Sequence, residues 1–301
     1  MSSICCLLDA CTIINLIHID EDDFILKKLA KLDIHINDVV FSEVKINVYD
    51  RLSNTNISKY SNKVSLEKNR KLIDQKLVFF RGKKNDNDNL LNDLGENYFE
   101  KIKQITDYGK KTNGELCSTA YALYLSRCNE KKVFFYTDDI PAKQDFTPFF
   151  DYQQIGHIKD SVDLIILLYW LDENFTEQQL KNVLSELYSQ YATDVKLLQN
   201  ALEKFQQDNV DAKYKRSYKD ASDKLSILIH KLRDLDFQDI IEIRSFFENK
   251  RSRHKAINDI LDKFSTVFNL DNGFQNGNFL EKIKITMNNA NKVHKYLDLC
   301  S

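Results

Sequence analysis

The chain has 301 residues, a length that suits one large domain or two smaller ones. Its residues are 43% hydrophobic and 29% charged, as in water-soluble globular proteins, and seven glycines and two prolines indicate few tight turns and long helices. The formal net charge of −2 excludes a global basic field, so any surface for nucleic acid must be local.

Short apolar runs alternate with helical patterns through the first half of the chain, which predicts a parallel sheet flanked by helices. Ile4–Leu8 is a continuous apolar run typical of a buried parallel strand, and it ends at Asp9. Further strands are predicted at Asp38–Phe41, Val133–Tyr136 and Gln153–Ile158. Helices are predicted at Thr12–Ile19, Asp22–Leu32, Val44–Leu52, Leu116–Arg127 and Ser161–Leu171.

The pattern weakens between residues 53 and 95, and Lys83–Asn97, crowded with Asn and Asp, is expected to form a mobile surface loop. Beyond about residue 175 the strand signals vanish. Amphipathic helices are predicted at Glu177–Tyr191, Thr193–Gln207, Asp220–Leu232, Phe237–Lys250, Lys255–Phe268 and Asn278–Tyr296. We therefore expect an α/β domain over residues 1–175 and an all-helical domain over 176–301, with the boundary between 172 and 192.

Two targeting signals are missing from the sequence, and their absence predicts the cellular location. No basic region precedes the apolar run of the N-terminal MSSICCLLDAC, and the most apolar stretch, Val162–Leu171, has half of the about 20 residues that a membrane span needs. The six cysteines form no C-x-x-C pair, and no histidine lies at zinc-ligand spacing from them. We expect a cytoplasmic protein without membrane contact, whose cysteines are small hydrophobes in a reducing environment.

Carboxylates follow the predicted strands at the points where those strands end. Asp9 comes directly after the first strand, Asp138 and Asp139 follow the strand at Val133–Tyr136, and Glu115 opens a helix. Ligand sites of parallel sheets form outside the carboxyl ends of the strands, so these acids are expected to converge.

Converging carboxylates repel one another, and a divalent cation with a preference for oxygen ligands, Mg²⁺ or Mn²⁺, removes that conflict. Such an ion can polarise a phosphate and lower the pKa of an attacking water. Each acid also has a purely structural interpretation. Asp9 can cap the next helix, Glu115 can favour a helix dipole, and Asp138-Asp139 can be turn residues.

The order of these segments resembles that of the PIN (PilT N-terminal) nuclease family. Leu8–Leu16 is similar to the family's opening D-[AT]-[SN]-x-[LVI]-[LVI]-x-L, and Asn113–Glu115 with the following helix resembles G-E-x-x-A-[IL]-x-[LY]. Tyr136–Ala142 resembles [VI]-T-[DN]-D-x-x-A, and Ile155-Gly156 resembles the I-G-T close of some members. The resemblance covers about residues 4–190.

This resemblance implies a PIN-like three-layer α/β/α fold with a central parallel sheet. It also implies that Asp9, Glu115 and one or both of Asp138 and Asp139 are catalytic ligands of Mg²⁺ or Mn²⁺, with Thr137 beside them. Members commonly cleave single-stranded RNA, and many are toxins or defence effectors.

The chain departs from the family at the second acid, which normally lies in a pattern like S-x-x-V-x-x-E. Asn47 stands at the place of that glutamate, and Glu43 lies one helical turn earlier as a possible substitute ligand. An asparagine can coordinate Mg²⁺ through its carbonyl oxygen but brings no charge. The leading hypothesis is therefore a metal-dependent endoribonuclease. The alternatives are an inactive PIN-fold scaffold or RNA-binding module, and a structure-selective DNA nuclease.

Three basic clusters stand out against the neutral background, at Arg81–Lys84, Lys213–Lys219 and Lys250–Lys255. The second interleaves tyrosines with Lys213, Lys215, Arg216 and Lys219, which suits phosphate contacts combined with base stacking. The alternative is a solvated helix face. The C-terminal helices could also dock on the first domain, self-associate or bind a protein partner.

Overall fold

The computed structural model describes residues 4–20, 22–49, 63–85, 97–106, 108–109, 112–270 and 279–298. The chain divides into two compact units, Met1–Val183 and Leu184–Ser301. The division falls inside one long helix, α11 (Glu177–Asn209).

The first unit is built on a five-stranded parallel sheet with the strand order β3-β2-β1-β4-β5. Its strands are β1 (Ile4–Leu8), β2 (Ile34–Asn37), β3 (Lys84–Asn85), β4 (Lys132–Tyr136) and β5 (Gly156–Lys159). The predicted central parallel sheet is confirmed. In the register of the two central strands, Leu8 of β1 lies opposite Tyr136 of β4, so both strands end at the same level.

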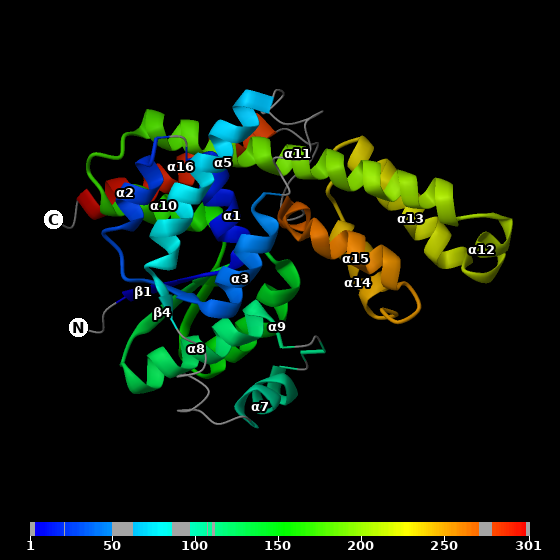
Figure 1. Ribbon diagram of the computed structural model, residues 1–301, viewed down its shortest axis with the longest axis horizontal. Helices are drawn as coiled ribbons and strands as arrows, with labels where there is room; N and C mark the ends of the chain where they lie inside the picture. The colour runs from blue at the N-terminus through cyan, green and yellow to red at the C-terminus, as the bar shows by residue number, and fades with distance from the viewer. Residues whose placement is uncertain are drawn as a thin grey trace. The chain divides into compact units, whose positions relative to one another are not determined.

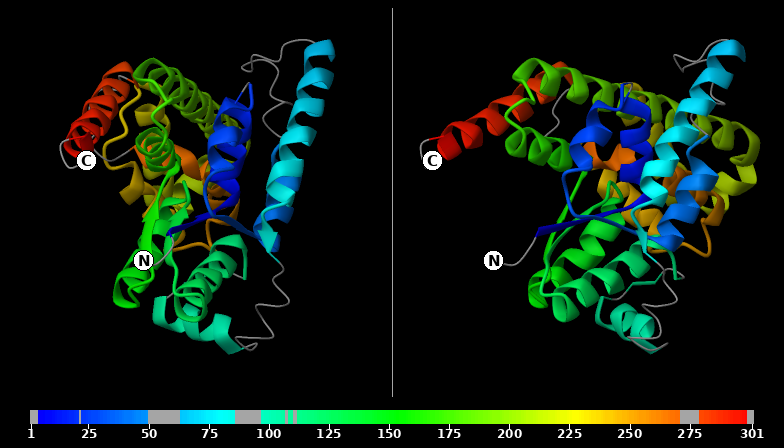
Figure 2. Two further views of the ribbon diagram at one scale, coloured as in Figure 1. Left: turned by 90° about the vertical axis from the view of Figure 1, so that its left-hand side faces the viewer. Right: turned by 60° about the vertical axis from the view of Figure 1, so that its left-hand side comes forward.

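Helices cover both faces of this sheet (Figures 1 and 2). On one face lie α8 (Gly114–Cys128) and α9 (Ile140–Tyr152), with α7 (Asn97–Thr106) packed against them. On the other face lie α1 (Ala10–Ile19) and α10 (Ser161–Leu171). The first unit is therefore a three-layer α/β/α arrangement.

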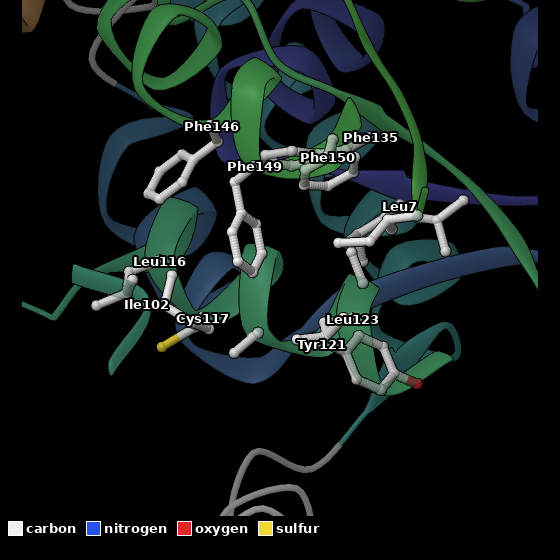
Figure 3. Packing of buried hydrophobic residues seen from close by; sticks show 14 of the residues in the cluster. Leu7, Ile102, Leu116, Cys117, Tyr121, Leu123, Phe135, Phe146, Phe149 and Phe150 are labelled. Atoms are coloured by element: carbon white, nitrogen blue, oxygen red, sulfur yellow. The ribbon is translucent and has the colours of Figure 1, made fainter. Parts of the chain in front are cut away.

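Alternation of side chains along the strands builds the core beneath α8 and α9. Leu7 of β1 and Phe135 of β4 point to that face and are fully buried there. Figure 3 shows the Phe149 ring of α9 reaching toward α8, and the Phe150 ring lies beside Phe135 at a centroid distance of 6.3 Å. This packing holds the last turn of α9 between β4 and α8.

The predicted strand at Asp38–Phe41 is wrong. The second strand is Ile34–Asn37, and the following apolar residues belong to α3 (Asp38–Asn47). The Asn37 side chain caps this helix by accepting a hydrogen bond from the Val39 N–H at 2.9 Å. Val40 and Val44 then fall one turn apart on the buried face, so the apolar run is a helical stripe instead of a strand.

The segment between α3 and α7 contains more regular structure than its composition indicates. Helix α5 (Lys63–Arg81) falls where no helix is predicted, and Lys84–Asn85 of the expected loop pairs with β2 as strand β3. The rest of that loop, residues 86–96, lies outside the described residues, as do residues 50–62. Helix α2 (Phe24–Leu29) is shorter than predicted.

The second unit is helical throughout its described residues. After α11 come α12 (Ala212–Ser217), α13 (Lys219–Arg233), α14 (Ile240–Glu248), α15 (Lys255–Lys263), a short 3₁₀ helix (Ser265–Leu270) and α16 (Phe279–Asp298). The two helices predicted over residues 177–207 are one continuous helix, since no glycine or proline interrupts that stretch. Among the helices that the structure describes, none has the length and apolarity needed to cross a membrane.

Candidate active site

The strand order places a topological switch point between β1 and β4, because the chain proceeds from β1 to β2 on one side and continues at β4 on the other. In open parallel sheets, ligands bind outside the carboxyl ends of the strands at such a point. Asp9 follows β1 there, and Thr137, Asp138 and Asp139 follow β4.

Asp9 is 2% exposed and stands at the N-cap position of α1, but its side chain does not cap that helix. Its Oδ2 atom instead accepts hydrogen bonds from the Thr137 hydroxyl at 2.9 Å and the Cys11 thiol at 3.0 Å. Its Oδ1 atom is buried without a hydrogen-bond partner in the described part of the chain. Burial, with a smaller contribution from the charge of Glu43, raises the pKa of Asp9 to about 6.

Glu43 of α3 enters this cluster through the start of α8. Its Oε1 atom accepts a hydrogen bond from the Gly114 N–H at 3.1 Å. Burial and the neighbouring charge of Glu115 raise the pKa of Glu43 to about 7. The approach requires glycine, because a Cβ atom on residue 114 would lie 2.5 Å from Glu43 Oε2.

The structure brings Glu43 beside the other acids, whereas Asn47, the residue at the family's glutamate position, is exposed at the last residue of α3. Glu115 is half-buried one residue after Gly114, and its Oε2 accepts a hydrogen bond from the Tyr108 hydroxyl at 3.4 Å. Burial, and after it the charges of Glu115 and Asp139, raise the pKa of Tyr108.

The two consecutive aspartates after β4 have different surroundings. Asp138 is fully buried, and its Oδ1 accepts from the Ser161 N–H at 3.0 Å, while its Oδ2 accepts from Asn15 Nδ2 at 2.6 Å and from the Ser161 hydroxyl. Asp138 thus ties β4 to α1 and α10. Asp139 is the N-cap of α9, where its Oδ1 accepts from the Ala142 N–H at 3.4 Å.

Thr137 joins the two sides of the cluster. Its hydroxyl donates to Asp9 Oδ2 and accepts a hydrogen bond from the Asp139 N–H at 3.1 Å. Thr137 links Asp9 to Asp139, Tyr108 contacts Glu115, and the Gly114 N–H holds Glu43 next to Glu115. We call the region of these four acids the acidic cluster. Asn15, Ser161 and Tyr108 support it and were not predicted, because hydrogen bonds between residues distant in sequence leave no local pattern.

A cation from the protein itself lies at the edge of this region. Lys143, one turn into α9, forms an ion pair with Asp160 at 3.0 Å. Although burial disfavours its charge, Asp160 and Asp138 raise the pKa of Lys143. Burial likewise opposes ionisation of Asp160, but the Lys143 ammonium holds the pKa of that carboxyl below its ordinary value.

Within the described residues, no three of the clustered carboxylates bring one oxygen each within 4.8 Å of one another. The group that meets this criterion is Cys5, Asp33 and His35, at the opposite, amino edge of β1 and β2. These residues could hold a metal ion, but the Lys131 ammonium already lies 2.6 Å from Asp33 Oδ2 and 3.1 Å from His35 Nε2. Spacing rules missed this group, because its members come from neighbouring strands.

The chain matches no family model, and neither the comparison with curated proteins nor that with solved structures finds a match. The interpretation of the acidic cluster therefore depends on its own geometry and on the sequence segments that meet there.

Proposed function

We propose that the first unit is a metal-dependent nuclease of the PIN type whose acidic cluster hydrolyses phosphodiester bonds of RNA. The observation that carries the proposal is the buried Oδ1 atom of Asp9, which accepts no hydrogen bond from the described residues and lies in a region shared with Glu43, Glu115 and Asp139. An unsatisfied buried carboxylate oxygen is costly unless a cation or donor occupies its free lone pairs.

The donor set suits Mg²⁺ or Mn²⁺, since every clustered acid offers oxygen atoms. Mg²⁺ in proteins is commonly held by one or two carboxylates and keeps several waters, so three closely spaced protein oxygens are not needed. Asp9, Glu43, Glu115 and Asp139 are the residues that would hold the ion. When bound, it would polarise the phosphodiester and lower the pKa of the attacking water.

Neighbouring residues position the carboxylates by hydrogen bonds. Thr137 orients Asp9 by donating to Oδ2, so Oδ1 is the atom that would hold the ion. The Gly114 N–H fixes Glu43 through Oε1. Asp138 is a positioning residue in this proposal, because its oxygens already accept hydrogen bonds from Asn15 and Ser161. Glu43 takes the place of the family's second acid, so the asparagine at position 47 does not abolish activity.

The proposal is tested with full-length protein, single-stranded RNA and single-stranded DNA in Mn²⁺, Mg²⁺ or EDTA. RNA cleavage should require metal and fall at least about 100-fold in Asp9→Asn. The matched control is Asp151→Asn, which removes an exposed aspartate at the end of α9. RNA binding without cleavage would indicate an inactive scaffold, and cleavage of DNA alone would indicate a DNA nuclease. Activity that survives both EDTA and Asp9→Asn would show that the site is misassigned.

A second comparison tests the assignment of Glu43. Glu43→Gln should reduce metal-dependent cleavage about as strongly as Asp9→Asn, whereas Asn47→Ala should leave it within about twofold of the parent. Loss of activity in Asn47→Ala with retention in Glu43→Gln would return the ligand role to Asn47.

A further inference from the structure

Two basic segments that are distant in sequence come together in the second unit. Tyr218 lies between α12 and α13, and His254 lies at the start of α15. Their rings meet edge to face at a centroid distance of 5.7 Å. The basic segment of α12 and the turn between α14 and α15 therefore belong to one surface, here called the basic surface (Figure 1). Its exposed cations are Lys213, Lys215, Arg216, Lys219, Lys250, Arg253 and Lys255.

Most of this charge is not neutralised by neighbouring acids. In the part of the chain that the structure describes, none of the surface's lysines forms an ion pair, whereas Arg251 in the same turn is paired with Asp262. Of the nearby acids, Asp211 is engaged in capping α12 through the Tyr214 N–H at 2.6 Å, and Asp220 is exposed. Burial, and after it the positive charges of Arg253 and Lys250, lower the pKa of His254.

Aromatic rings are interleaved with the cations. The rings of Tyr214 and Tyr218 lie 5.0 Å apart, and Tyr218 is 36% exposed. The Lys250 ammonium lies 4.7 Å from the centre of the Phe246 ring, which in turn stacks near His254. Proteins bind single-stranded nucleic acid by stacking its bases on aromatic rings and by contacting its phosphates with neighbouring cations.

We propose that the basic surface binds single-stranded nucleic acid, with phosphates on the cations of both segments and bases stacked on Tyr214 and Tyr218. The combination of rings with cations favours this ligand over an anionic lipid surface, which amphipathic helices recognise through a broad apolar face flanked by lysines. This inference is independent of the acidic cluster, because binding is measured without metal and without cleavage.

Binding is tested on the full chain by fluorescence anisotropy in EDTA, with labelled U₂₀ RNA and dT₂₀ DNA over a series of KCl concentrations. Neutralising Lys213 and Lys215 together, or Lys250 and Arg253 together, with glutamine should each weaken binding. Each pair should also reduce the slope of log K against log[KCl] by about 1.4, because each lost phosphate contact on a single strand contributes about 0.7. The matched control neutralises Lys204 and Lys284, exposed lysines of the same unit that lie outside the surface.

The aromatic contribution is tested separately. Tyr218→Leu should weaken binding about tenfold because it removes a stacking platform, whereas Tyr218→Phe should bind as the parent does. Slopes for both glutamine pairs that equal the control slope would overturn the proposal. A changed slope for the α12 pair alone would refute a shared surface, and stronger binding to phosphatidylserine vesicles than to U₂₀ would assign the surface to lipid. Comparing U₂₀ with dT₂₀ shows which single strand it prefers.

Discussion

Gly114→Ala tests whether the close approach of α3 to α8 holds Glu43 in the acidic cluster. The added Cβ would lie 2.5 Å from Glu43 Oε2 and 2.9 Å from Val40 Cγ2. Both distances are shorter than real contacts, so the Glu43 carboxylate must move away and the buried Val40 side chain must also shift. The 3.1 Å hydrogen bond from the residue-114 N–H to Glu43 is then lost.

Two destabilising contributions and one stabilising contribution determine the change in the free energy of unfolding. A hydrogen bond to a charged acceptor contributes about 1.5–3 kcal/mol, and overpacking at a buried site costs about 1–3 kcal/mol. Alanine favours the helix over glycine by at most about 1 kcal/mol. We expect the free energy of unfolding to fall by about 1.5–5 kcal/mol, and the affinity for Mn²⁺ to fall with it, because Glu43 leaves the cluster.

The assay is urea unfolding with and without Mn²⁺ at pH 8, above the pKa of about 7 for Glu43, so that this carboxylate is ionised. The control is Gly109→Ala, where the added Cβ meets nothing within 4 Å. If Gly114→Ala matched Gly109→Ala both in stability and in stabilisation by Mn²⁺, the steric argument and the role of Glu43 would be refuted together.

Three further predictions follow from buried polar groups. Asp9 has a folded-state pKa of about 6 against an ordinary value of 3.8, so in EDTA the stability that it contributes is present below pH 4 and is lost as the pH rises through 6. Asp9→Asn should therefore exceed the parent in unfolding free energy at pH 7.5 by about 3 kcal/mol, and match it near pH 4. An unchanged difference between these pH values would contradict the burial argument. Asp138→Asn should lower the unfolding free energy by about 1–3 kcal/mol, because its amide group would face the donors of Asn15 and Ser161, and equal urea midpoints for Asp138→Asn and its parent would exclude this role. Lys131→Met should expose the Cys5–Asp33–His35 group to metal and produce a Co²⁺–thiolate absorption band that the parent lacks, and a variant spectrum without that band would count against a latent site.

The sequence predicts the central strands well, because their signal is local. Ile4–Leu8 and Val133–Tyr136 are apolar runs bounded by polar residues, and burial on both faces produces that pattern. The second strand was misplaced because Val39-Val40-Phe41 has the composition of a strand. The Asn37 side chain caps a helix that begins at Asp38. In a sequence, an asparagine so close to a β-branched run is a weak signal for a helix start.

The sequence predicts which acids are candidates for the acidic cluster, and the structure shows which residues contact each of them. Position after a strand was enough to select Asp9 and the Asp138-Asp139 pair as candidates. Position after a strand could not distinguish the role of Asp138 from that of Asp139. The difference comes from hydrogen bonds that Ser161 and Asn15, remote in sequence, donate to Asp138. The proximity of Glu43 to Glu115 was equally inaccessible, since it depends on the packing of α3 against α8.

The adjacency of β1 and β4 in the sheet has a consequence for the order of events during synthesis. Asp9 and the Thr137 hydroxyl that orients it are separated by 128 residues. At a translation rate of about 5–20 residues per second, roughly 6–26 s pass between the addition of Asp9 and that of Thr137. Throughout that interval β1 lacks its longest partner strand, so the nascent chain cannot assemble the acidic cluster while the ribosome is still reading the first half of its message. The hydrolysis proposed for the acidic cluster would therefore be absent until β4 had been synthesised.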